Sequence, residues 1–182
     1  MKDLTLRTQK LETSAFLKPE QGLYISVMPS AASVRNLEPV INVLHSFGVS
    51  YTGMPNLHVT VLYSSTSVSD LDQLYKTAEI DPTNIYIANV DKFEYWAGHK
   101  NQGVLVLKLN SPQLEKVHYK LRKEGYKVNF PDYQAHMTFV DDLHDQGFNE
   151  KRSKQLVKIL NGQLSGVLNK LELTGMKAES VS

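Results

Sequence analysis

Two short stretches of the chain alternate hydrophobic and polar residues with the period of a β-strand. Residues 57–63 have the sequence Leu-His-Val-Thr-Val-Leu-Tyr, and residues 135–140 have the sequence Ala-His-Met-Thr-Phe-Val. Side chains alternate between the two faces of a strand, so residues i and i+2 point the same way. Each stretch therefore places an imidazole and a hydroxyl on one face, from His58 with Thr60 and from His136 with Thr138. Two such strands can line a polar groove.

The hydrophobic pattern gives the same order of elements in the two halves of the chain. A hydrophobic run, a stretch with helical spacing and a His-containing strand follow one another twice. Ser33 precedes the first helical stretch in the manner of an N-cap, and Ser111-Pro112 begins the second. Besides the two His strands, we expect strands at 22–28, 85–95, 104–109 and 167–176, and helices at 34–48, 70–75, 111–125 and 148–160.

This order predicts an α+β protein with two similar lobes, each with a helix packed on its sheet. The lobes cover roughly 22–80 and 84–176 of a single domain at 22–182, with room for an exchange of strands between them. Residues 1–21 are polar and mixed in character. We assign no chemistry to this N-terminal arm.

Composition narrows the classes of partner. The 182 residues suit one compact domain, with 41% hydrophobic and 21% charged residues. A net charge of +1 gives no general attraction for long nucleic acid and suits a small anionic ligand better. The absence of cysteine excludes disulfides, thiolate nucleophiles and Cys-ligated zinc. No hydrophobic run has the length of a membrane span or the form of a signal peptide, so we expect a cytoplasmic protein without membrane contact.

The paired motifs supply the groups that cleave a ribose phosphodiester without a metal or cofactor. One imidazole can remove the proton of the neighbouring 2′-OH while the other protonates the leaving 5′ oxygen, because histidine titrates at about pH 6.5. Threonine hydroxyls can donate hydrogen bonds to the non-bridging oxygens as charge shifts onto them. The expected catalytic residues are His58, Thr60, His136 and Thr138. The sequence leaves open which histidine is the base.

The two His-x-Thr motifs lie 78 residues apart, each in a hydrophobic strand that follows a helix and a proline-containing turn. This pattern resembles the 2H phosphoesterase superfamily, whose members carry two such motifs on facing strands of a bilobal fold. Within it, the chain is most similar to phage anti-CBASS phosphodiesterases, which destroy the cyclic oligonucleotide alarm signals of the host. The similarity is carried by Asn56-Leu57-His58-Val59-Thr60-Val61-Leu62-Tyr63, Lys92-Phe93-Glu94-Tyr95-Trp96, Gly103-Val104-Leu105-Val106-Leu107 and Pro131-Asp132-Tyr133-Gln134-Ala135-His136-Met137-Thr138.

The resemblance implies two pseudo-symmetric antiparallel sheets that form a central cleft, with helices packed outside. The two His-x-Thr motifs would converge there on one phosphate. The implied reaction is cleavage of 3′–5′ bonds in cyclic di- or trinucleotides by 2′-OH attack, in the host cytoplasm, which helps a phage to evade CBASS defence. The resemblance also implies that Trp96 and Tyr24 contact the bases of the substrate, because an aromatic ring offers a stacking surface.

Two other functions remain open. A 2′,3′-cyclic phosphodiesterase or 2′–5′ RNA ligase-like enzyme of RNA metabolism would use the same motifs on linear ends. A noncatalytic cyclic-nucleotide sponge would bind the signal without cleaving it, although binding alone does not require two titratable groups on opposed strands. The Tyr95-Trp96 pair and the low net charge favour the cyclic oligonucleotide phosphodiesterase.

The remaining histidines and tyrosines have ordinary explanations. His45 and His118 fall at the edges of hydrophobic helical stripes, so we expect them to be packed or solvated. Tyr63 and Tyr133 are expected to be structural or peripheral. His144 lies among aspartates, but its spacing matches no closed set of metal ligands.

Overall fold

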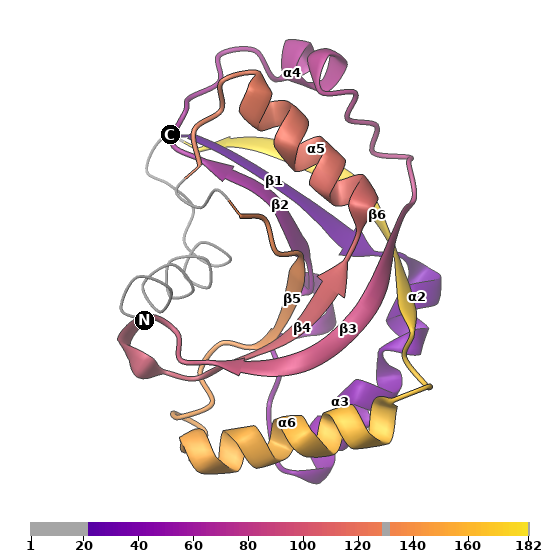
Figure 1. The fold of residues 1–182 in the computed structure, drawn as a ribbon, viewed down its shortest axis with the longest axis vertical. Coiled ribbons are helices and arrows are strands. Elements are labelled where there is room, and N and C mark those ends of the chain that lie inside the picture. The colour runs from indigo at the N-terminus through magenta and orange to yellow at the C-terminus, as the bar shows by residue number, and fades with distance from the viewer. Residues whose placement is uncertain (1–21, 129–131, 182) are drawn as a thin grey trace.

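Six antiparallel strands form the framework of the protein. The computed structural model describes residues 22–128 and 132–181. Hydrogen bonds join the strands into a closed barrel in the order β1-β2-β5-β4-β3-β6 (Figure 1). The strands are β1 (Gly22–Pro29), β2 (Val59–Ser64), β3 (Tyr86–Trp96), β4 (Val104–Asn110), β5 (His136–Val140) and β6 (Lys170–Val181).

The closed arrangement differs from the expected pair of separate sheets. The C-terminal strand β6 pairs with β1 on one side and with β3 on the other, so it joins strands from both halves of the chain. On the opposite side, β2 and β5 meet at the single pair Val59 and Met137. The expectation of two separate sheets is wrong, because the last strand satisfies backbone groups of both halves. The mixture of helices with antiparallel strands is confirmed.

Helices pack against the strands of this sheet. α6 packs against β3, and α5 packs against β2 and β3. No helix of the described ranges is long and apolar enough to cross a membrane. The helices are α2 (Ala31–Asn36), α3 (Glu38–Ser46), α4 (Leu71–Thr77), α5 (Pro112–Lys123) and α6 (Glu150–Leu164), with short 3-10 turns η1 (Met54–Asn56) and η2 (His99–Asn101).

The first expected helix is divided in two. The N-cap of α2 is Ser30, whose side chain accepts a hydrogen bond from the backbone N–H of Ser33, so the expected cap at Ser33 is wrong. Ser33 instead accepts the backbone N–H of Glu172 on β6. Pro39 in the first turn of α3 lacks the N–H that would continue the ladder from α2. Ser111 caps α5 as expected, with Pro112 at the first helical position.

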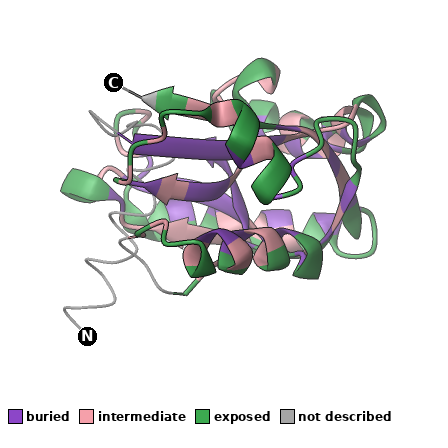
Figure 2. Cartoon of the chain, turned by 90° about the horizontal axis from the view of Figure 1, so that it is seen from above, coloured by how far each residue is buried: buried purple, intermediate pink, exposed green. Residues whose placement is uncertain are grey.

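The hydrophobic core lies on the far side of the two His strands. The alternate positions Val59, Val61, Met137 and Phe139 are fully buried, which confirms the predicted faces of these strands. Figure 2 shows buried residues along the strands and exposed residues on the outer faces of the helices. The N-terminal arm at 1–21 and Pro131 lie outside the described residues.

Candidate active site

The two His-x-Thr motifs meet where β2 adjoins β5. Val59 lies opposite Met137, and the strands are antiparallel. Because such strands advance in opposite directions, this register places His58 beside Thr138 and Thr60 beside His136. The hydrophobic partners face the core, so all four polar side chains lie on the other face. The structure therefore brings together the four residues that the sequence singled out.

Each histidine is held by a hydrogen bond of the same kind, from its Nδ1 to a backbone carbonyl. Nδ1 of His58 lies 2.7 Å from the carbonyl oxygen of Asn56, and Nδ1 of His136 lies 2.9 Å from that of Gln134. A carbonyl can only accept, so each Nδ1 carries the proton. In the neutral ring, Nε2 then presents a lone pair. The sequence contains the same spacing twice, since each carbonyl belongs to the residue two positions before the histidine.

The surroundings of the two imidazoles differ. His136 is only 6% exposed, whereas His58 is half-buried. Burial lowers the pKa of His136 to about 4, the hydrogen bond to Gln134 opposes this shift, and the charge of His58 adds to it. At neutral pH the ring of His136 is therefore uncharged and able to accept a proton.

The two threonine hydroxyls also differ. Oγ1 of Thr60 lies 3.2 Å from the hydroxyl of Tyr24, whose ring meets that of His58 edge-on at 6.2 Å. Burial raises the pKa of Tyr24 to about 12, against the effect of the Thr60 hydrogen bond. Oγ1 of Thr138 is buried and makes no hydrogen bond within the described part of the chain. An unpaired buried hydroxyl is destabilising, so a ligand oxygen beside Thr138 would satisfy a group that the protein leaves unpaired.

Trp96 lies against the site at the end of β3. Its ring centroid is 4.7 Å from that of His136, and its Nε1–H donates to Oε2 of Glu94 at 2.8 Å. Burial would raise the pKa of Glu94, but the hydrogen bond from Trp96 and the ammonium groups of Lys108 and Lys92 lower it below the usual value. Glu94 is therefore a charged acceptor that fixes the indole beside the imidazole.

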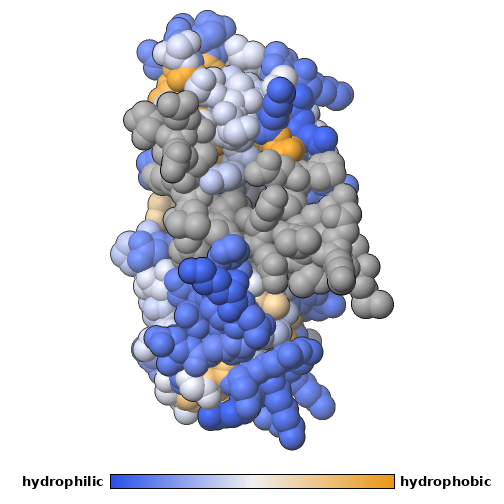
Figure 3. All heavy atoms as spheres, turned by 90° about the vertical axis from the view of Figure 1, so that its left-hand side faces the viewer, coloured by the Kyte–Doolittle hydropathy of each residue, from blue (hydrophilic) through white to orange (hydrophobic). Residues whose placement is uncertain are grey.

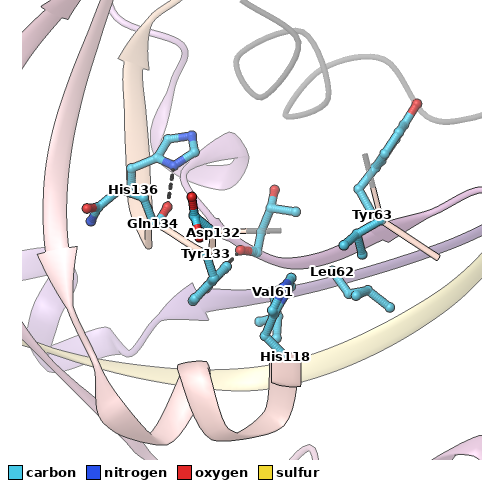
Figure 4. Close-up of a pocket in the computed structure, with 10 residues that line it drawn as sticks. Val61, Leu62, Tyr63, His118, Asp132, Tyr133, Gln134 and His136 are labelled. Carbon is cyan, nitrogen blue, oxygen red and sulfur yellow. Dashed lines mark hydrogen bonds between the residues drawn. The ribbon is translucent and has the colours of Figure 1, made fainter. Parts of the chain in front are cut away.

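Two hollows adjoin the histidines. The larger, about 420 Å³, is lined by His58 and by the charged residues Asp141 and Lys177, which lie far apart in the sequence and which sequence patterns did not indicate. The smaller, about 40 Å³, contains His136 and His118 in its wall. Figure 4 shows His136 bonded to Gln134 on one side of this smaller hollow and Tyr63 on the other.

The described surface on one side of the molecule is mostly polar (Figure 3). On the face shown in Figure 3, hydrophilic residues dominate the described surface and hydrophobic ones form small separate areas. Between residues 22–128 and 132–181, no three His, Asp or Glu side chains are grouped so that they could hold a metal ion.

Comparison with known proteins agrees with these features. The family model described as anti-CBASS protein Acb1 matches residues 21–170. The chain is 26% identical over 132 residues to the anti-CBASS protein Acb1 of Vibrio phage KVP40, which covers 72% of this chain and 80% of that protein. A solved structure described as a phosphoesterase aligns with a TM-score of 0.45 at 15% identity, over 67% of this chain and 74% of the other, too low a score to add to the assignment. The similarity to phage anti-CBASS proteins is confirmed, and the chain belongs to the anti-CBASS protein Acb1 family.

Proposed function

We propose that this protein is a metal-independent phosphodiesterase that cleaves the 3′–5′ bonds of cyclic oligonucleotide immune signals in the host cytoplasm and so helps a phage to evade CBASS defence. The observation that carries this proposal is the junction of β2 and β5. There, two imidazoles share one strand face with two threonines, and the Nδ1 of each imidazole is bonded to a backbone carbonyl two residues before it. Membership of an anti-CBASS family supports the choice of substrate.

The reaction needs one proton acceptor and one proton donor. The 2′-OH attacks phosphorus as its proton passes to Nε2 of one histidine, and the P–O5′ bond breaks as Nε2–H of the other histidine protonates the leaving oxygen. The product is a linear oligonucleotide with a 2′,3′-cyclic phosphate and a free 5′-OH. Later attack of water on the cyclic phosphate would give a terminal phosphate.

We assign the base to His136 and the acid to His58. A general acid must carry a proton before the reaction, and burial disfavours the charged form of His136. The half-buried His58 lines the larger hollow and is less removed from water than His136. An anionic phosphate between the rings would favour the transient positive charge on His136.

Threonines and aromatic residues complete the proposed site. Thr60 and Thr138 would donate to the non-bridging oxygens, and the unpaired hydroxyl of Thr138 supports this role. Trp96 is partly exposed, and Tyr24 lines the hollow beside His58. We propose that both contact the bases of the substrate.

The test is incubation of the protein with cyclic di- and trinucleotides in the presence of EDTA, followed by chromatography of the products. Linear products with 2′,3′-cyclic or terminal phosphates support the proposal. Turnover of linear 2′,3′-cyclic ends alone would favour an enzyme of RNA metabolism. Loss of free ligand without products would favour a noncatalytic sponge, and a requirement for added metal would contradict the two-histidine mechanism.

A further inference from the structure

Each His-x-Thr motif is followed directly by a β-bulge. Ile25 lies opposite Leu62 and Ser26 lies opposite Thr60, so Val61 is an extra residue in β2. Leu105 lies opposite Val140 and Val106 opposite Thr138, so Phe139 is an extra residue in β5. Bulges interrupt the hydrogen-bond ladder and redirect neighbouring side chains. Both catalytic threonines of the proposed site therefore adjoin an irregularity that affects where their hydroxyls point.

Side chains from outside β2 hold the first bulge. The hydroxyl of Tyr133 donates to the carbonyl oxygen of Thr60 at 3.0 Å, and Nδ1–H of His118 donates to the carbonyl oxygen of Val61 at 2.8 Å. The rings of Tyr133 and His118 stack at 4.6 Å with an interplanar angle of 18°. A stacked pair of side chains thus supplies donors to two consecutive carbonyls that include the bulge.

The second bulge has a different partner. The carbonyl of Phe139 accepts the backbone N–H of Thr52 at 2.8 Å. Thr52 in turn accepts from the side chain of Asn56, whose carbonyl anchors His58. At the first bulge, the donor Tyr133 directly precedes Gln134, whose carbonyl anchors His136. The segment before each histidine therefore holds the bulge that follows the threonine of the other motif.

A buried histidine at position 118 lowers the stability of the fold compared with a hydrophobic residue. It is 4% exposed, and its Nε2 makes no hydrogen bond within the described residues. Burial lowers the pKa of His118, against the effect of the Val61 hydrogen bond, while the charge of Arg122 lowers it further. The ring is therefore neutral with a buried lone pair unsatisfied. A hydrophobic side chain would avoid that penalty but could not donate to Val61.

We propose that Tyr133 and His118 are positioning residues, which hold the bulge after Thr60 and thereby aim its hydroxyl at the phosphate beside His136. The inference rests on the proposed phosphodiesterase function. It assigns a catalytic consequence to two side chains that need not touch the substrate. Thr60 would bind the transition state more strongly than the ground state. Displacement of its hydroxyl should therefore lower kcat more than it changes KM.

The first test uses Tyr133→Phe, with Ser153→Ala as its matched control. Each change removes one hydroxyl that donates to a backbone carbonyl, and Ser153 lies on α6, away from the motifs. We expect Tyr133→Phe to lower kcat about tenfold with KM changed less than about twofold, whereas Ser153→Ala keeps the wild-type kcat. Equal kcat in the two variants would overturn the inference.

Three further variants separate positioning from general stability. Tyr133→Phe should have no added effect on kcat in a Thr60→Ala background, because the two residues act through one hydroxyl. His118→Asn keeps an N–H donor for Val61 and should retain most activity, whereas His118→Phe keeps the stacked ring and loses the donor. Additive losses in the double variant, or equal activity of the two His118 variants, would also contradict the proposal.

Amide hydrogen exchange distinguishes failure of the inference from failure of the proposed function. We expect Tyr133→Phe to accelerate exchange of the Val61 and Leu62 amides relative to Ser153→Ala, whether or not a substrate is known. If the wild-type protein cleaves no cyclic oligonucleotide, the proposed function fails and exchange alone decides whether the bulge is held. Unchanged exchange would overturn the inference even in an active enzyme.

Discussion

The indole of Trp96 lies 4.7 Å, centroid to centroid, from the imidazole of His136, with the two planes inclined by 57°. The indole thus covers a ring whose pKa burial has lowered to about 4. Its Nε1–H donates a hydrogen bond to Glu94, which fixes the orientation of the indole. The residue that the sequence suggests as a base contact therefore also shapes the environment of a proposed catalytic group.

Removal of this cover should change the pH dependence of catalysis. In Trp96→Ala, water would reach His136 and its pKa should rise from about 4 towards its ordinary value of about 6.5. A base must be unprotonated, so the variant should lose activity between these pH values, where the wild-type protein retains it. A pH profile of kcat/KM with an NMR titration of His136 measures the shift. An unchanged pKa would mean that Trp96 does not contribute to the burial.

Glu94 should matter through the indole that it holds. Glu94→Ala removes the acceptor of the Trp96 N–H and should weaken nucleotide binding by about fivefold, close to 1 kcal/mol, the usual value of one hydrogen bond. Glu94→Gln keeps an acceptor and should bind more tightly than the alanine variant. Isothermal titration with a cleavage-resistant cyclic dinucleotide measures this difference. Glu150→Ala, which breaks the exposed ion pair with Lys154, should bind as the wild type does.

A substrate with a bridging 5′ sulfur should distinguish the two histidines. A thiolate leaves without being protonated, so this substrate no longer requires the general acid but still requires the general base. On the ordinary substrate, His58→Ala and His136→Ala should each lower kcat by roughly 10²–10⁴-fold while the circular dichroism spectrum of the fold is kept. The sulfur substrate should restore turnover in His58→Ala alone. Restoration in His136→Ala instead would reverse the assigned roles, and the exposed His45→Ala serves as a control.

The buried imidazole should also make stability depend on pH. The pKa of His136 is about 4 in the folded protein, below the value of about 6.5 in an unfolded chain. Between these values only the unfolded state binds the proton, so the free energy of unfolding should fall on acidification, by on the order of 3 kcal/mol across this window. Urea titrations at pH 7 and pH 4.5 measure the change. In His136→Asn this contribution should vanish, whereas His45→Asn should keep it.

Local patterns predicted much of the secondary structure. Alternation at period two places the His and Thr of each motif on one face, and this holds in the structure because burial of Val59 and Met137 fixes which face is inward. The predicted cap at Ser111 holds because its side chain accepts a hydrogen bond from a backbone N–H three residues later. The sequence does not single out Ser30 as the cap, because Ser33 also has a suitable side chain. In the structure, the hydroxyl of Ser33 instead accepts a hydrogen bond from β6.

The sequence by itself determined that two imidazoles and two hydroxyls would lie on strand faces opposite the core, because the period of a strand is a local property of the chain. Only the tertiary structure decided that β6 would close the sheet, that Trp96 would cover His136, and that a stacked tyrosine and histidine would hold the bulge after Thr60. These features depend on contacts between residues far apart in the chain. Such neighbours determine how far a side chain is buried, which pKa it has and which way it points, and no local pattern specifies them.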